Sequence, residues 1–186
     1  TILSAAKTVP PAGLAGKSLI PMLQGRVKEW RKHLFTEFHL HSAHNFYPQR
    51  SIRGERFKLI QNLQPDLLNP GYDFTMNRFF DGLQKTVAEN NNVRDAYSLM
   101  RRPPEFELYD LNNDPFEFRN LADDDNFSAQ LQLLKNRLAS WRRETNDPFL
   151  DPKNITRLQS EINSSIRDGK PDKKHLKLSY WDYFFE

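Results

Sequence analysis

The chain has 186 residues, of which 38% are hydrophobic, 27% charged and 12% aromatic, and its formal net charge is +3. This length indicates one domain with or without an appendage, and the many aromatic residues argue against intrinsic disorder. The chain contains no Cys, which excludes disulfide bonds, zinc–thiolate clusters and a cysteine nucleophile. The small net charge does not indicate nucleic-acid binding, and no apolar run is long enough for a transmembrane helix.

The N-terminal region predicts two short helices separated by a loop rich in Pro and Gly. Residues 1–6 have the character of the last turns of a helix, and residues 19–23 form a second helix that Ser18 caps and Gly25 ends. The chain begins with Thr1 and has no signal or transit segment, so we expect it to be part of a longer protein.

Alternating side chains predict a β-strand over residues 34–41. One face of this strand carries Leu34, Thr36, Phe38 and Leu40, and the other carries Phe35, Glu37, His39 and His41. Further strands are expected over residues 51–53, 56–63 and 106–111. The segment 64–104 contains short amphipathic pieces near residues 74–83 and 93–100, and a connection of this length is usually functional or packed against another element.

The longest predicted helix covers residues 127–141, with Asp125 or Asn126 as its N-cap. Its apolar side chains recur every three or four residues and so share one face: Phe127, Leu131, Leu134, Leu138 and Trp141. Another helix is expected over residues 155–166. Together these elements predict an α+β fold, in which a small antiparallel sheet of about four strands is covered on one face by the helix over 127–141.

Several segments resemble the sulfatase family. GKSLIPMLQG at residues 16–25 is similar to a segment that follows the catalytic domain of sulfatases. ELYDL at 107–111, with Asp114-Pro115, Glu117 and Asn120-Leu121, resembles a signature near the end of those enzymes. YPQRSIR at 47–53, RFKLIQNL at 56–63 and WRRETNDP at 141–148 look like the sulfamidase branch of the family. The signature itself is mainly a turn motif, since Asp residues cap turns and Pro sets the chain direction.

The resemblance implies the C-terminal subdomain of an alkaline-phosphatase-like sulfatase fold. Residues 1–32 would end the catalytic domain and its linker, 33–150 would form the C-terminal subdomain, and 151–186 would be a helical and aromatic extension. Sulfatases hydrolyse sulfate esters or sulfamates, and the sulfamidase branch points to sulfated glycans such as heparan-type N-sulfoglucosamine. The resemblance also implies an extracytoplasmic location.

The resemblance places the chemistry outside this chain. Sulfatases use a formylglycine made from Cys or Ser in a C/S-x-P-x-R motif, and they hold Ca²⁺ with Asp and Asn oxygens. Neither that motif nor the Asp pair of the family's metal site occurs here. We therefore expect no catalytic residue, metal ligand or cofactor in this chain. Its expected partners are an upstream catalytic domain and a sulfated carbohydrate, with no nucleic acid and no membrane.

Candidate substrate contacts gather around the end of the first predicted strand. Glu37, His39 and His41 share a face, His44 follows in a polar loop, and Arg50 is a further candidate. Imidazole and guanidinium groups suit an anionic sugar, and the resemblance places this segment near the mouth of the pocket. Two other interpretations stay open, namely surface imidazoles at a sheet edge and a zinc site formed by His at positions i and i+2.

A non-catalytic module that binds polyanions or carbohydrates is the alternative function. Lys28, Arg31 and Lys32 around Trp30 would supply its positive charge. The acidic residues 123–125 precede the longest helix, where negative charge is favourable, and a calcium site there is the less favoured interpretation. A C/S-x-P-x-R motif upstream in the parent reading frame would distinguish the sulfatase from the binding module.

Overall fold

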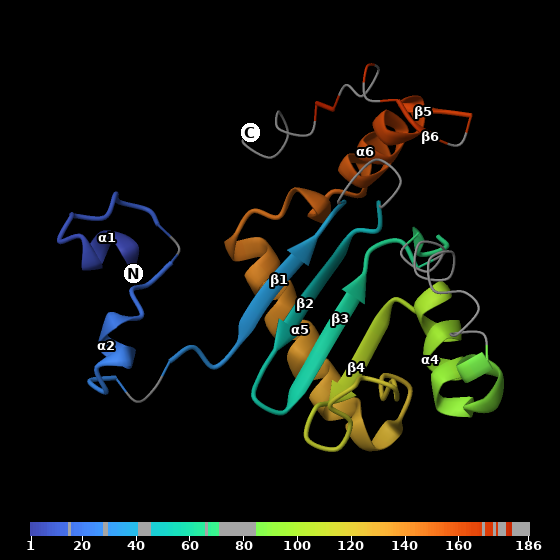
Figure 1. The fold of residues 1–186 in the computed structure, drawn as a ribbon, viewed down its shortest axis with the longest axis horizontal. Coiled ribbons are helices and arrows are strands. Elements are labelled where there is room, and N and C mark those ends of the chain that lie inside the picture. Colours follow the sequence, from blue (N-terminus) through green and yellow to red (C-terminus); the bar gives the residue numbers. More distant parts are fainter. Residues whose placement is uncertain are drawn as a thin grey trace. The chain divides into compact units, whose positions relative to one another are not determined.

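The fold is that of a computed structural model, which describes residues 1–14, 16–27, 30–40, 46–65, 67–70, 85–168, 170–172, 174 and 178–179. The chain separates into two compact units, Thr1–Lys32 and His33–Glu186 (Figure 1). Assignment of the first unit to the end of a catalytic domain stays a prediction. Among the described helices, none is long and apolar enough to cross a membrane.

The first unit contains the two predicted short helices, α1 (Ile2–Ala5) and α2 (Ile20–Leu23), but α2 begins one residue after the predicted start, with Leu19 rather than Ser18 at its N-cap position. The Thr1 hydroxyl accepts a hydrogen bond from the backbone N–H of Leu19 at 2.8 Å, which ties the start of α2 to the start of the chain. The Ser18 hydroxyl accepts one from the N–H of Ile20 at 3.3 Å. Gly25 follows α2 with φ of +67°, a left-handed conformation that Gly adopts without steric cost.

The second unit is built on a four-stranded antiparallel sheet whose strands lie in chain order. The strands are β1 (Leu34–Phe38), β2 (Gln49–Arg53), β3 (Phe57–Asn62) and β4 (Phe106–Asp110). The predicted sheet is confirmed, although β1 ends three residues before the predicted end at 41, and β2 begins at Gln49 rather than at 51. Phe35 pairs with Ile52, Ile52 with Leu59, and Leu59 with Leu108, so one apolar row crosses all four strands.

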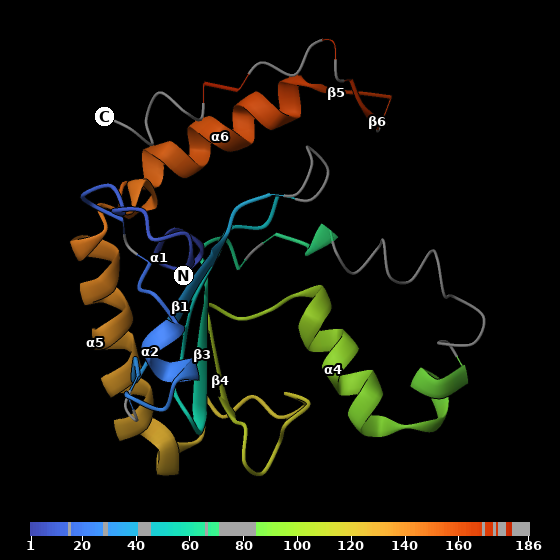
Figure 2. The same cartoon turned by 60° about the vertical axis from the view of Figure 1, so that its left-hand side comes forward.

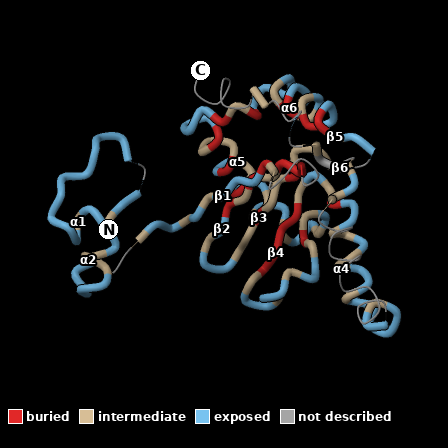
Figure 3. Tube along the Cα trace, turned by 45° about the horizontal axis from the view of Figure 1, so that its top comes forward, coloured by how far each residue is buried: buried red, intermediate tan, exposed pale blue. Residues whose placement is uncertain are grey.

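Helix α5 (Ser128–Glu144) covers this apolar row on one face of the sheet (Figure 2). Buried residues recur in β2, β3 and α5 and are most continuous in β4 (Figure 3). Trp141 stacks on Phe35 with ring centroids 5.0 Å apart. Apolar burial is the main source of stability here, and the buried cluster consists of Ile52, Leu59, Leu108, Leu121, Leu134 and Leu138. The predicted covering helix is confirmed.

The start of α5 differs from the prediction. A 3₁₀ turn, Asp125–Phe127, precedes the helix, and α5 itself has no side-chain cap at its N-terminus. The capping carboxylate belongs to Asp124, whose Oδ1 accepts from the N–H of Asn126 at 3.1 Å. Asp124 also pairs with Arg119 at 3.2 Å. The expected caps Asp125 and Asn126 are therefore wrong by one or two residues, because the chain enters α5 through the 3₁₀ turn.

A second helix, α6 (Pro152–Ser164), builds a separate apolar cluster beyond the end of the sheet. It begins three residues before the predicted helix, and Asp151 caps it by accepting from the N–H of Lys153 at 2.9 Å. A 3₁₀ turn, Pro148–Leu150, connects α5 to it, and the short strands β5 (Ile166–Arg167) and β6 (Lys170–Pro171) follow. The buried members of this cluster are Phe46, Phe149, Ile155, Leu158 and Ile162.

Helix α4 (Asn91–Arg101) lies on the side of the sheet opposite α5 (Figure 2). Asn90 caps it by accepting from the N–H of Val93 at 3.2 Å. Leu99 and Met100 line a hollow together with Ile60 and Tyr109 of the sheet. The predicted amphipathic piece at 93–100 is confirmed, and the piece at 74–83 lies outside the described residues.

Candidate functional site

The sulfatase-like signature over residues 107–121 begins within β4 and supplies hydrogen bonds along the outer edge of this strand. Asn120 accepts hydrogen bonds at its Oδ1 from the N–H groups of Leu108 at 2.8 Å and Ala122 at 2.9 Å. The Asn120 amide donates to the Phe106 carbonyl at 3.2 Å, and the Leu121 N–H donates to the Leu108 carbonyl at 2.8 Å. These bonds satisfy backbone groups of β4 at its outer edge, where an unpaired strand would invite aggregation.

The two Asp residues of the signature organise its turn. Asp110 accepts from Arg56 Nε at 3.0 Å and Nη2 at 2.7 Å, and from the Asn113 amide at 2.8 Å. The hydrogen bond from Arg56 is the main reason that the pKa of Asp110 falls to about 2. Asp114 accepts from the N–H of Arg119 at 2.8 Å. These contacts confirm that the segment is mainly a fold signature.

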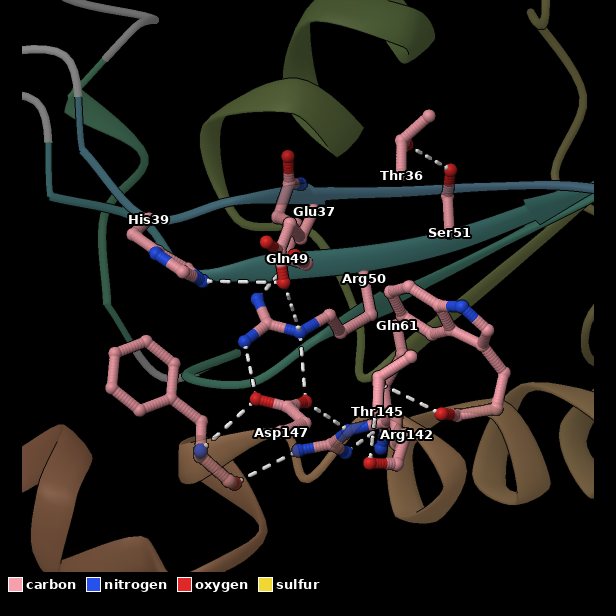
Figure 4. A network of polar contacts seen from close by, with 12 residues as sticks. Thr36, Glu37, His39, Gln49, Arg50, Ser51, Gln61, Arg142, Thr145 and Asp147 are labelled. Carbon is pink, nitrogen blue, oxygen red and sulfur yellow. Dashed lines mark hydrogen bonds and ion pairs between the residues drawn. The ribbon is translucent and has the colours of Figure 1, made fainter. Parts of the chain in front are cut away.

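On the helix-covered face of the sheet, one carboxylate lies between two guanidinium groups (Figure 4). Asp147 accepts hydrogen bonds from Arg50 Nε at 2.8 Å and Nη2 at 2.6 Å, and from Arg142 Nε at 2.6 Å. Arg50 belongs to β2, Arg142 to the last turn of α5, and Asp147 to the connection that leads to α6. All three side chains are buried, so the triad joins three elements at one point.

The remaining donors of the triad are also used inside the fold. Arg50 Nη1 donates to the Gln49 carbonyl at 2.9 Å, Arg142 Nη1 to Gln61 Oε1 at 3.1 Å, and Arg142 Nη2 to the Phe149 carbonyl at 2.8 Å. The N–H of Phe149 donates to Asp147 Oδ1 at 3.0 Å. Burial by itself would raise the pKa of Asp147, but hydrogen bonds and charge from Arg50 and Arg142 outweigh burial and lower it.

His39 lies just beyond β1, next to this triad, and is only 9% exposed. Its ring packs edge-on against Phe149 with centroids 4.8 Å apart, and its Nε2 is 3.8 Å from Glu37 Oε2. Burial and, secondly, the charge of Arg50 lower the pKa of His39 to about 4, against an opposing effect of Asp147. His39 is therefore neutral near pH 7. Its description as a surface imidazole is wrong, because Phe149 and the triad enclose it.

The structure brings three of the five sequence-predicted site residues together. Glu37 pairs with Arg50 across the strands, its Oε2 lies 3.8 Å from Arg50 Nε, and its side chain is half exposed. Arg50 is fully buried and bound to Asp147, which favours a structural role for it over a contact with sugar. The other two, His41 and His44, lie outside the described residues, and their role stays a prediction.

Sequence reasoning missed the partners of this cluster. From the sequence, Asp147 followed by Pro148 predicts only the end of the helix over 127–141, and nothing indicates a role for Phe149. Asp147 is 97 positions from Arg50 along the chain, so no local spacing connects them. The available signal was the sulfamidase-like segment WRRETNDP, which contains both Arg142 and Asp147 but does not indicate the strand that they meet.

The opposite face of the sheet carries a shallow hollow, lined by Thr36, Phe38, Gln49, Ser51, Lys58 and Ile60 among others. The hydroxyls of Thr36 and Ser51 are 2.7 Å apart and hydrogen bonded. Lys58 Nζ donates to both carboxylate oxygens of Glu117, at 2.9 and 2.6 Å. The hydroxyls of this hollow bind each other and its Lys58 binds Glu117, so the Lys58 ammonium group is paired within the fold rather than left for an anionic sugar.

The described residues contain no group of three or more His, Cys, Asp or Glu side chains that could hold a metal ion. The zinc interpretation depends on His41, which is not among them. In the first unit, the Arg31 guanidinium lies over the Trp30 ring at 5.6 Å from its centroid. Lys28 of that proposed cationic patch is not described either.

Comparison with known proteins identifies the family. The family model for the C-terminal domain of N-sulphoglucosamine sulphohydrolase matches residues 1–97. Human N-sulphoglucosamine sulphohydrolase is 34% identical over 144 residues, which is 74% of this chain and 28% of the relative. An ulvan-active sulfatase of Formosa agariphila is 28% identical over 145 residues, which is 74% of this chain and 26% of the relative. The chain thus spans about a quarter of the length of these relatives.

Solved structures share the fold. The structure of a 2-O GAG sulfatase matches with a TM-score of 0.55 and 24% identity, over 80% of this chain and 24% of that chain. A second protein, solved in complex with its substrate D-glucosamine-2-N,6-O-disulfate, matches with a TM-score of 0.52 and 22% identity over the same shares. The signature, the α+β architecture and the match over residues 1–97 agree, and the chain belongs to the family of N-sulphoglucosamine sulphohydrolase C-terminal domains.

Proposed function

We propose that this chain is the C-terminal part of a sulfatase that releases sulfate from sulfated glycans, with N-sulfoglucosamine units of heparan type as the favoured substrate. It completes the fold of the enzyme and forms part of the rim of the substrate pocket. The observation that carries the proposal is the match of residues 1–97 to the sulfamidase C-terminal family model. An upstream domain, in an extracytoplasmic protein, would carry the reaction.

The residues of this chain support the assignment of the reaction to an upstream domain. A formylglycine nucleophile and a Ca²⁺ ion supply the chemistry in sulfatases, and this chain has no Cys and no C/S-x-P-x-R motif from which to make the former. The proposed contribution of this chain is to position residues of the substrate pocket. The buried triad of Arg50, Asp147 and Arg142 fixes the end of the sheet from which the segment with His41 and His44 leaves. A neutral imidazole there would donate to, or accept from, a sugar hydroxyl, and a protonated one would bind sulfate oxygen.

The first test is a substrate panel with the full-length parent enzyme. Release of sulfate from N-sulfoglucosamine faster than from 2-O- or 6-O-sulfated units supports the proposal. Preference for an O-sulfate ester would keep the sulfatase class and overturn the favoured linkage. The isolated chain should release no sulfate, and activity from it would contradict the assignment of nucleophile and metal to the upstream domain.

The second test is His41→Ala in the full-length enzyme. A hydrogen bond to a charged group contributes about 1.5–3 kcal/mol, so loss of one in the transition state should lower kcat/KM by roughly 10- to 150-fold. Thermal stability is expected to change little, because a side chain that serves only to contact substrate contributes little to packing, and such substitutions usually stay within about 0.5 kcal/mol. His175→Ala is the control, because this histidine stands alone in the sequence with no other candidate site residue near it, and it should leave both quantities unchanged. Unaltered kcat/KM in His41→Ala would remove this residue from the pocket.

A parent protein that binds heparan-type chains without releasing sulfate would favour the alternative function, a non-catalytic polyanion-binding module. That outcome requires an upstream reading frame without the C/S-x-P-x-R motif. Binding would then depend on ionic strength, because Lys and Arg contacts to a polyanion are screened by salt.

A further inference from the structure

Helix α4 and the sheet form a hollow of about 200 Å³ on the face of the sheet opposite α5, called the α4 hollow below. Its apolar wall includes Leu99 and Met100 of α4 and Ile60 of β3, and Glu107 and Tyr109 of β4 line another part. A cavity of about 150 Å³ holds one benzene molecule, so the α4 hollow has room for one small organic molecule.

The Glu107 carboxylate at this hollow has hydrogen bonds but no counter-charge. Glu107 is 8% exposed, its Oε1 accepts from the Asn62 amide at 2.8 Å, and its Oε2 accepts from the Tyr109 hydroxyl at 2.5 Å. Lys58, on the same face of the sheet, binds both oxygens of Glu117 instead. Among the residues that the structure describes, none forms an ion pair with Glu107. A buried charge without an opposite charge lowers stability, so a cation from outside would be favourable here.

Two buried tyrosines respond to this carboxylate. Burial and, secondly, the charge of Glu107 raise the pKa of Tyr47 to about 12, and the same two causes raise the pKa of Tyr109. Tyr47 is 2% exposed, and its hydroxyl has no hydrogen-bond partner within the described part of the chain. The neighbours of Glu107 therefore feel its charge, which no described side chain neutralises.

The hydrogen-bond donors around Glu107 are used, whereas acceptor positions remain. The Asn62 amide donates to Glu107 and, at 2.7 Å, to the Pro104 carbonyl, and the Tyr109 hydroxyl donates its hydrogen to Glu107. Each carboxylate oxygen can accept a further hydrogen bond. A primary ammonium group supplies three donors and a positive charge, and an aromatic ring such as that of Tyr109 attracts a cation over its face. A metal ion would require several oxygen ligands where the hollow has its apolar wall.

We infer that the α4 hollow binds a primary ammonium group on a short carbon stem, with Glu107 as its counter-charge. The ammonium group donates to the remaining lone pairs of Glu107, and the stem packs against Leu99, Met100 and Ile60. Small alkylamines carry this group, and so do amino sugars with a free amine, which hydrolysis of the N–S bond of N-sulfoglucosamine would leave. Only the amino-sugar source rests on the proposed function.

The test measures binding of n-butylammonium chloride to the full-length parent protein at pH 7 by isothermal titration calorimetry, with n-butanol as the uncharged probe. Butylammonium should bind roughly tenfold more tightly than butanol, because hydrogen bonds between charged groups are stronger than those of neutral ones. Glu107→Gln, which keeps the shape and removes the charge, should abolish this preference. Glu105→Gln is the matched control, since Glu105 is exposed and lies just before β4, and it should bind as the wild type does.

A second pair of variants tests the place rather than the charge. Ala96 of α4 lines the hollow, so Ala96→Trp should fill it and abolish binding while Glu107 stays in place. Ser98→Trp adds the same bulk at an exposed position of α4 and should leave binding unchanged. Circular dichroism verifies that each variant is folded.

Equal affinity for butylammonium and butanol would overturn the inference, as would butylammonium binding that survives Glu107→Gln or Ala96→Trp. Absence of binding to the folded wild-type protein would also overturn it. Competition with butylammonium by glucosamine, but not by N-acetylglucosamine, would identify an amino sugar as the ligand, and lack of competition would identify an alkylamine. A parent protein that releases no sulfate would overturn the proposed function and leave the butylammonium result unaffected.

Discussion

The two helices that pack on the second unit stabilise it in different ways. Helix α5 lies flat on the sheet and buries a continuous row of aliphatic side chains, and its last turn contributes Arg142 to the buried triad. Helix α6 lies beyond the end of the sheet, and its apolar cluster is connected to the strands through a buried Asp and two Arg. The first contact is broad and tolerant of change, whereas the second depends on a few groups that must all be present.

This difference follows from how each kind of contact contributes to the free energy of folding. Apolar side chains gain free energy in proportion to buried area, so loss of one leaves the others in place. Buried ions gain stability only when each charge is compensated, and removal of one partner leaves the others uncompensated. The residues Arg50, Arg142 and Asp147, with the adjacent His39, connect the α6 cluster to the sheet and are called the α6 junction below. We expect single substitutions at this junction to lower stability more, and in a more pH-dependent way, than those at the α5 side of the sheet.

Asp147→Ala should have the largest effect. It leaves Arg50 and Arg142 buried without a counter-charge, which should lower the free energy of unfolding of the full-length protein by about 3–5 kcal/mol, measured by urea denaturation. The control is Asp110→Ala, which removes the other Asp that binds an Arg with two hydrogen bonds. Its partner Arg56 has a half-exposed side chain that water can solvate, so the loss should be clearly smaller. Equal losses would mean that burial does not distinguish the two sites.

Acid should weaken the α6 junction through His39. The pKa of His39 is lowered from 6.5 to about 4 in the folded protein by burial and Arg50, so the folded state binds fewer protons than the unfolded state between these values. The stability contribution is fully present above pH 6.5 and is lost as pH falls toward 4, with a total of at most about 3 kcal/mol.

The measurement is the midpoint of urea unfolding at intervals between pH 7 and 4.5, above the range in which Asp147 would titrate. His39→Gln should flatten this dependence. His33→Gln, at the start of the second unit, is the matched control and should keep the wild-type slope. A slope that is identical in both variants would show that His39 is not the group that takes up the proton.

On the α5 side, Asn120→Ala should have a moderate effect. It leaves the N–H groups of Leu108 and Ala122 without their acceptor, and an unsatisfied donor costs about 1–3 kcal/mol when it is buried. Thermal unfolding should shift accordingly, and hydrogen exchange should accelerate at Leu108 while the α6 cluster stays protected. Asn113→Ala, in the preceding turn, removes a bond to Asp110 only and should have a smaller effect. A loss of protection that spread to residues 155–162 would contradict the separation of the two clusters.

Much of the fold was predictable because its determinants are local. Alternation in 34–40 and the three-to-four-residue repeat in 127–141 each arise from one face of one element meeting the core, and the structure confirms both. The cap of α5 was misplaced, since a 3₁₀ turn and an α-helix begin with the same residue types. Among the site residues, the face shared by Glu37 and His39 was predicted from alternation, but the burial of His39 was not.

The sequence by itself determined the class of fold, the order of helices and strands along the chain, the face on which each strand residue lies and the family resemblance. The tertiary structure alone decided that Arg50, Arg142 and Asp147 meet, that Phe149 packs against His39, and that Leu40 and Phe46 share an apolar cluster with α6. The reason is physical. Periodicity records which side of an element faces the core, whereas an ion pair between residues 97 positions apart depends on how the elements pack together, and no repeat along the chain encodes that.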